Sequence, residues 1–148
     1  MLRVTRLTDY ATVLMTRMAR DPERNASAVH LAAESDIPVA TVTKLLKLLN
    51  RAGLVQSLRG VNGGYGLARA PAAISVADVV AAIEGPVALT ACAVGKGNCE
   101  FEKYCITRGN WQLISRAVQT ALEAVSIKDM AAPVARPIQV RTGIPHRN

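Results

Sequence analysis

The sequence predicts a mainly α-helical fold with one small β-hairpin. Half of the 148 residues are apolar and only 3% are aromatic, and the apolar residues are mostly Ala, Leu and Val, a composition that favours helices. Most segments repeat apolar residues at spacings of three and four, the period of an amphipathic helix. One Gly-rich stretch, GVNGGYG at residues 60–66, separates two short strand-like runs and is typical of a hairpin turn. A chain of this length forms one domain, or one small domain with an appendage.

The N-terminal segment predicts two helices. Thr8 is the expected N-cap of the first, whose apolar residues follow at helical spacing until Asp21-Pro22 ends it. The second helix is expected at residues 28–34, after Ser27. A tight turn that contains Pro then leads into a third helix.

The third helix is expected over residues 39–51 and stops at Gly53. One of its faces is apolar and the other is polar and basic. Two short helices joined by a tight turn, the second with a basic face, form a helix-turn-helix pattern, although any small helical bundle can contain such a turn. The apolar stripe is Val42, Leu45, Leu46 and Leu49, and the side chains expected to face the major groove of DNA or its phosphates are Thr41, Thr43, Lys44 and Lys47.

Two strands, expected at residues 54–58 and 65–68, enclose the Gly-rich turn. A hairpin directly after the second helix of a helix-turn-helix is a wing. Its tip residues Arg59, Asn62 and Gly63 are expected to approach the minor groove, because Arg is favoured there and Gly allows close backbone approach. The glycines do not form a nucleotide-binding loop, since no Lys-Ser/Thr pair and no helix follow them.

The charge of the chain is unevenly distributed. The net charge is +7, to which residues 1–70 contribute ten Lys/Arg against five Asp/Glu and residues 71–130 five against six. A basic N-terminal half favours a polyanion such as DNA as the partner, although a basic solvated surface gives the same count. We therefore assign residues 1–70 to a winged helix-turn-helix DNA-binding domain.

The second half of the chain begins with a short helix that a capping box at Ser75 and Asp78 introduces. Residues 71–109 end in a loop that holds all three cysteines of the chain. Residues 110–130 contain no Gly or Pro and predict one long helix with two apolar stripes, which a small domain cannot bury by itself. The sequence therefore predicts a homodimer held by this helix, and residues 131–148 predict a disordered tail.

These features resemble one family. A first helix that begins LTDYA, the wing RGVNGGYGLAR, and three cysteines ahead of a long helix resemble the bacterial regulators typified by IscR and NsrR. ISVADVVAAIEGP and CITRGNW are most similar to the branch that regulates the SUF iron–sulfur assembly operon. The resemblance covers residues 1–130. It implies a homodimeric regulator of transcription, not an enzyme, that binds double-stranded DNA, senses iron–sulfur cluster status, oxidants or nitric oxide, and controls cluster-assembly genes.

The resemblance also implies the ligands of an iron–sulfur cluster, namely Cys92, Cys99 and Cys105. IscR-like members carry a His three residues after the third cysteine, where this chain has Arg108, which cannot be a ligand. NsrR-like members complete a 4Fe–4S cluster with an Asp from the partner subunit, and the aligned residue here is Asp9. A 2Fe–2S and a 4Fe–4S cluster both stay open, and so does an ordinary role for Asp9 at the start of a helix.

The cysteines alone leave other interpretations open. A zinc site usually has four ligands with paired spacings of two to four residues, which this chain does not show. A cluster-free thiol switch is favoured by nearby basic residues, which lower thiol pKa values. A redox enzyme with Cys92 as its nucleophile would need a catalytic His or an acid pair near the thiols, and none is evident.

The sequence also bears on location. No apolar run approaches the roughly 18 residues that cross a bilayer, and the segment MLRVTRLTDYA lacks the apolar stretch of a signal peptide. The expectation is a cytoplasmic protein without membrane contact, where thiols stay reduced.

Overall fold

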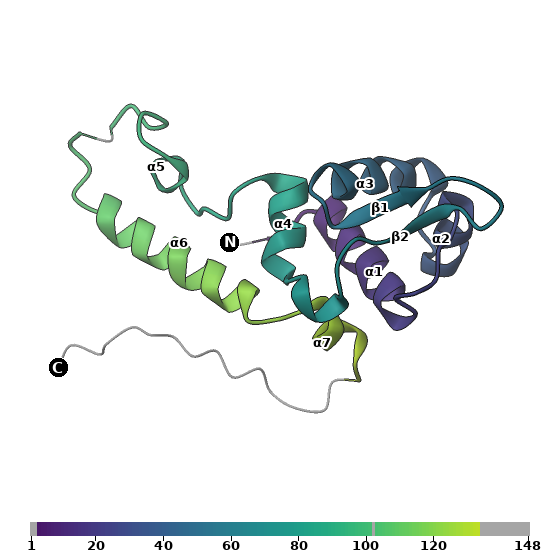
Figure 1. Ribbon diagram of the computed structural model, residues 1–148. Helices are drawn as coiled ribbons and strands as arrows, with labels where there is room; N and C mark the ends of the chain where they lie inside the picture. The colour runs from purple at the N-terminus through teal and green to yellow at the C-terminus, as the bar shows by residue number, and fades with distance from the viewer. Residues whose placement is uncertain (1–2, 102, 134–148) are drawn as a thin grey trace.

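The computed structural model describes residues 3–101 and 103–133, and the predicted tail at 134–148 lies outside the described residues. The mainly α-helical fold with one two-stranded antiparallel hairpin is confirmed (Figure 1). In chain order the elements are α1 (Arg6–Arg20), α2 (Ala28–Ser35), α3 (Val39–Arg51), β1 (Val55–Leu58), β2 (Gly64–Leu67), the 3₁₀ turn η1 (Pro71–Ala73), α4 (Val76–Glu84), α5 (Ala91–Val94), α6 (Arg108–Glu123) and α7 (Ile127–Ala131).

Helix α1 begins earlier than its sequence predicts. The N-cap is Thr5, whose side chain accepts a hydrogen bond from the backbone N–H of Thr8, so the prediction of Thr8 as N-cap is wrong. Thr8 instead lies inside the helix with 1% of its surface exposed, because its hydroxyl donates to Glu84 on α4. The predicted apolar face is confirmed as buried, and its members are Ala11, Leu14, Met15 and Met18.

The helix-turn-helix forms as its pattern predicts. Ser27 caps α2 by accepting a hydrogen bond from the backbone N–H of His30. Asp36 takes a left-handed conformation with φ of 55° in the turn between the helices, a conformation that Asp tolerates better than most residues. Helix α3 spans the predicted range, and its four apolar residues at 42, 45, 46 and 49 are completely buried.

The hairpin pairs in the register Val55↔Leu67 to Leu58↔Gly64. A third segment joins it, because Ala26 pairs with Tyr65 through two backbone hydrogen bonds of 3.1 and 2.9 Å. The wing is therefore fixed to the segment that leads into α2, which sets its position relative to the helix-turn-helix.

The helix-turn-helix and the wing share one core with α1, α4 and α7, and we call this unit the winged body. It extends beyond the predicted boundary at residue 70. Ile74, Val79 and Ile127 are buried in the same core as the residues of α1 and α3. Helix α4 begins with the predicted capping box of Ser75 and Asp78. The core of the N-terminal half is thus completed by residues from α4 and from α7.

The predicted single helix over residues 110–130 is wrong, because two helices occupy this range. Helix α6 ends at Glu123, and a second capping box, made by Ser126 and Asp129, starts α7. Backbone bonds from Val76 N–H to Val125 O and from Ile127 N–H to Ile74 O, both 2.8 Å, fix the break. The chain turns here because α7 docks beside α1 in the winged body.

Helix α6 projects away from this body (Figure 1). Helix α5 and the loop that follows it lie toward the far end of α6, while the wing tip points away on the opposite side of the molecule. The two segments that the sequence marks as functional therefore lie at opposite ends of the structure.

Candidate functional site

The outer face of α3 carries the predicted basic residues. The exposed basic residues are Lys44, Lys47 and Arg51, and Ala40 is exposed beside them. Their spacings of four, three and four residues, counted from Ala40, align all four along one side of the helix. Thr41 and Thr43 are partly exposed beside this row. The Thr43 hydroxyl donates a hydrogen bond of 2.9 Å to the Val39 carbonyl oxygen. All four predicted α3 contacts are thus outside the core.

The wing tip presents the other predicted contacts. Arg59 and Asn62 are exposed in the turn between β1 and β2. A Cβ atom at Gly63 would lie 2.5 Å from the Leu58 carbonyl oxygen, and one at Gly64, which has φ of +132°, would lie 2.7 Å from the Ala26 carbonyl oxygen. Both positions require glycine on steric grounds, so the tight turn that holds Arg59 and Asn62 out to solvent depends on them.

Electrostatics favour an anionic partner for this surface. Residues 37–77, which include α3 and the entire wing, contain five Lys/Arg and no Asp or Glu. The positive charges sit on α3, on the wing tip and at its base, at Lys44, Lys47, Arg51, Arg59 and Arg69. Arg69 at the base lies 3.7 Å from the Asp78 carboxylate, so the positive charges on α3 and at the wing tip are the ones that favour contact with phosphate.

The cysteine segment lies at the other end of the structure. All three cysteines are free thiols, with Cys92 buried on α5 and Cys99 and Cys105 partly exposed. Among residues 3–101 and 103–133, no group of three or more His, Cys, Asp or Glu side chains is gathered closely enough to hold a metal ion. The described chain therefore supplies thiols in one segment without bringing their sulfur atoms together.

The surroundings of Cys105 favour its thiolate form. A contact of 3.5 Å between its Sγ and the Thr107 hydroxyl lowers the pKa of the Cys105 thiol, and the backbone N–H groups of Thr107 and Arg108 and the Arg108 charge act in the same direction. Cys105 lies just before α6, so the start of that helix contributes donors to the sulfur.

Asp9 lies in the first turn of α1 and is exposed. It lines a mostly apolar groove of about 600 Å³ between α1, α4 and α6, together with Val94, which follows Cys92 by two residues. Asp9 is not gathered with the cysteines in the described residues. The groove nevertheless places it on the side of the winged body that faces the cysteine segment.

Glu84 joins α4 to the start of α1, and sequence reasoning missed it. Its Oε1 accepts hydrogen bonds from the Thr5 hydroxyl at 2.8 Å, from the Thr5 backbone N–H at 3.3 Å and from the Thr8 hydroxyl. The Thr8 hydroxyl is the largest cause of a lowered pKa of the Glu84 carboxyl, and the Thr5 hydroxyl is the next. No local sequence signal reveals these contacts, because Thr8 and Thr5 lie 76 and 79 residues before Glu84.

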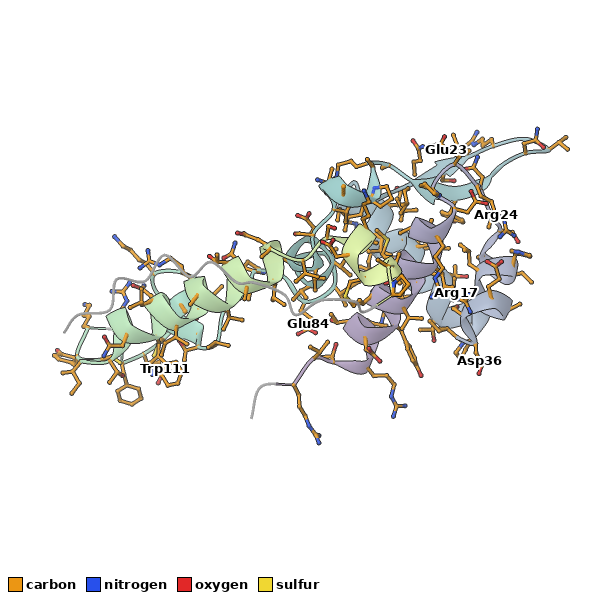
Figure 2. The ribbon with its side chains drawn as sticks, turned by 90° about the horizontal axis from the view of Figure 1, so that it is seen from below. Arg17, Glu23, Arg24, Asp36, Glu84 and Trp111 are labelled. Atoms are coloured by element: carbon orange, nitrogen blue, oxygen red, sulfur yellow. The ribbon has the colours of Figure 1, made fainter. Side chains whose placement is uncertain are left out.

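Helix α6 leaves large apolar side chains in solvent. Trp111, Leu113 and Ile114 are 39, 49 and 44% exposed, and Ser115 is the one buried residue of this helix. Figure 2 shows Trp111 at the end of α6 that is distant from the winged body, and Glu84 where α4 approaches α1. A helix with this much exposed apolar surface is typical of an interaction face.

In the part of the chain that the structure describes, no helix has both the length and the apolar character needed to span a bilayer.

Comparisons with known proteins place the chain in a family. Residues 4–133 match the model of the Rrf2 family, described as an iron-dependent transcriptional regulator. The chain is 30% identical over 130 residues to the transcriptional regulator IscR of Vibrio cholerae, which covers 87% of this chain and 75% of that protein.

Solved structures of regulators have the same fold as this chain. CymR, the global cysteine regulator of B. subtilis, aligns with a TM-score of 0.69 at 29% identity over 88% of this chain and 97% of that one. IscR of T. potens aligns with a TM-score of 0.68 at 27% identity over 87% of this chain and 85% of that one. These relatives are regulators of transcription and not enzymes, which agrees with the predicted resemblance. The chain therefore belongs to the Rrf2 family of iron-dependent transcriptional regulators.

Proposed function

We propose that the protein is a homodimeric, cytoplasmic regulator that binds double-stranded DNA through α3 and the wing and senses iron–sulfur cluster status through Cys92, Cys99 and Cys105. The observation that carries the DNA-binding part is the acid-free segment 37–77, whose five positive charges lie on a helix-turn-helix and a wing. Thr41, Thr43, Lys44 and Lys47 contact the major groove or its phosphates, and Arg59, Asn62 and Gly63 approach the minor groove.

The proposed dimer rests on α6. One apolar side of this helix has no cover within the described residues, and a second copy of the same helix supplies a matching surface. A dimer binds two half-sites, so the operator is expected to be palindromic.

The chemistry of the donor set fits an iron–sulfur cluster. Three reduced thiols within fourteen residues are soft ligands that such clusters prefer. Because the sulfur atoms are not gathered in the described chain, the segment from Cys92 to Cys105 must close to hold one. When bound, the cluster supplies an iron site that reacts with oxygen or nitric oxide. Asp9 of the partner subunit is the candidate for the remaining position, and the nuclearity, 2Fe–2S or 4Fe–4S, is left open.

The chain offers a route from the cysteines to the DNA-binding face. Gln112 of α6 donates to the Cys92 carbonyl oxygen at 3.5 Å, and the Leu89 N–H donates to the Ser115 hydroxyl at 3.1 Å. The cysteine segment and Leu89 are thus both bonded to α6, and we propose that a movement of the cysteine segment is passed on to residues 85–89. These residues continue directly from α4, where Glu84 holds the start of α1. By this route we propose that cluster loss changes the orientation of the winged body, and that the regulated genes include cluster-assembly genes.

A cluster-free thiol switch is the second candidate. The lowered pKa of Cys105 favours it, because a thiolate reacts with oxidants faster than a thiol. Anaerobic purification separates the candidates. A visible absorption band with iron and acid-labile sulfide supports the cluster, bound zinc supports a zinc site, and a colourless, metal-free protein that binds DNA only when reduced supports the thiol switch.

DNA binding has its own test. Selection from a random duplex library should yield a palindromic operator whose affinity falls steeply with salt, since each neutralised phosphate steepens the salt dependence. A chain that enriches no sequence contradicts the DNA-binding proposal.

A further inference from the structure

The hydroxyl of Thr43 is occupied inside its own helix. It donates to the Val39 carbonyl oxygen at 2.9 Å, the back-bonding that threonine makes to the residue four positions earlier in a helix. This bond selects one of the two χ1 positions open to a helical threonine. The hydroxyl is then directed along the helix, and the γ-methyl group is what Thr43 offers to a surface placed against α3.

The surroundings of Thr43 share this apolar character. Ala40, three residues earlier and therefore its neighbour on the helix surface, is exposed and also ends in a methyl group. The segment Val39–Thr43 contains no Arg, Lys, Asn, Gln, Asp or Glu. The first charged side chain of the helix is that of Lys44, followed by Lys47 and Arg51 on the same exposed side.

This composition restricts which bases the start of α3 can read. Direct readout of guanine, adenine or cytosine in the major groove uses Arg or Lys, Asn or Gln, and Asp or Glu. The segment Val39–Thr43 has none of these side chains. A threonine hydroxyl can also bond a base edge, but the Thr43 hydroxyl already donates to the Val39 carbonyl oxygen, so its methyl group is the part that remains for a base. Thymine is the base that presents a methyl group in the major groove, and Ala and Thr methyl groups contact it.

We infer that Thr43 is a specificity-determining residue that reads the 5-methyl group of a thymine in each half-site through its γ-methyl group, with Ala40 beside it. The inference rests on the proposed DNA-binding function and deepens it. The N-terminal residues of a recognition helix contact base edges, and the positive charges at Lys44 and Lys47 bring this face to the DNA. Burial of one methyl group is worth about a fourfold change in affinity for each half-site.

The test replaces single thymines of the selected operator by deoxyuridine, which lacks only the methyl group. Each thymine is replaced symmetrically in both half-sites, and affinity is measured by fluorescence anisotropy at fixed salt. The full-length wild-type protein should lose about fifteenfold in affinity, two half-sites together, at one thymine position. No loss at any thymine, or an operator without thymine, overturns the inference while leaving the DNA-binding proposal intact.

Two substitutions separate the methyl from the hydroxyl. Thr43→Val keeps a methyl group and removes the hydroxyl, and it should still distinguish thymine from uracil. Thr43→Ser keeps the hydroxyl and removes the methyl, and it should bind the two operators equally. The matched control is Thr12→Ser on α1, where the threonine hydroxyl makes the same bond to the carbonyl oxygen four residues earlier, that of Thr8; this variant should retain the wild-type discrimination. The reverse result, discrimination kept by Thr43→Ser and lost by Thr43→Val, overturns the inference.

Circular dichroism checks that each variant is folded. If Thr43→Ser fails to fold, the uracil scan of wild type and Thr43→Val decides alone: discrimination in both supports the inference, and its absence in either one contradicts it. If no DNA is selected at all, the proposed function itself fails.

Discussion

At the tip of the wing, Arg59 holds a positive charge on an exposed turn that Gly63 and Gly64 shape. Inserted into a narrow minor groove, this side chain meets concentrated negative potential. Arg59→Ala should therefore weaken operator binding by about 1–3 kcal/mol. Anisotropy titrations measure the change, with Arg116→Ala on α6 as a matched removal of one positive charge. If both variants bind equally well, the wing does not contact DNA through Arg59.

Glu84 should make the stability of the protein sensitive to acid. Its pKa is lowered in the folded state, chiefly by the Thr8 hydroxyl, so its stabilising effect is present above the ordinary carboxyl value of 4.5 and is lost as the pH falls through the lowered value. Glu84→Gln should unfold more easily than wild type near neutral pH, and the difference should shrink toward pH 3.

Urea unfolding across this pH range measures the effect. Glu23→Gln is the control, since Glu23 is an exposed carboxyl in the α1–α2 connection (Figure 2). A constant difference between Glu84→Gln and wild type at all pH values would show that the carboxylate charge does not hold α1 to α4.

Single residues also show what sequence can and cannot reveal. The exposed positions of Lys44 and Arg59 follow from helix periodicity and turn chemistry, which are local properties. The N-cap of α1 was predicted at the wrong threonine, because the choice between Thr5 and Thr8 depends on Glu84, a partner distant in sequence. Contacts between residues that are far apart in the sequence cannot be predicted from a local pattern.

Helix α6 is the proposed dimer interface. Ile114 is 44% exposed and lies on the apolar side of the helix. Ile114→Asp should weaken the dimer by about 3 kcal/mol, because an unpaired charge would be buried between the two subunits. Sedimentation equilibrium measures the dimer dissociation constant. The control is Arg116→Asp, which places an Asp on the opposite side of α6 and should leave the dimer intact. An equally stable dimer for Ile114→Asp removes this side of α6 from the interface.

Helix α7 belongs to the winged body rather than to α6. Ser126→Ala removes the N-cap that starts it, and such a loss costs about 1 kcal/mol. Because Ile127 is completely buried in the main core, this loss should lower the unfolding free energy of the entire winged body. Ser57→Ala, at an exposed position of β1, is the control. Equal stability of the two variants would mean that α7 contributes little to the body.

The break between α6 and α7 was within reach of the sequence. Ser126 and Asp129 repeat the capping box of Ser75 and Asp78, whose residue pattern predicts the start of α4 from the sequence. The absence of Gly and Pro suggested a continuous helix, but the backbone bonds at Val125 and Ile127 decide the matter and come from a segment about fifty residues away. Helices α2 and α3, whose signals are local, were predicted nearly residue by residue.

In the molecule as a whole, the proposed DNA-binding face and the cysteine segment lie at opposite ends of one chain, linked through α4 and α6 (Figure 1). We propose that a cluster held by the three thiols controls the affinity of the distant face for DNA. The direct measurement follows the visible absorption and the operator affinity of anaerobically purified protein together during stepwise exposure to oxygen, with Cys99→Ala as the cluster-free control. The operator affinity should change in proportion to the loss of visible absorption and end at the value that Cys99→Ala shows from the start. A colourless wild-type protein, or an affinity that stays constant while the colour is lost, would contradict it.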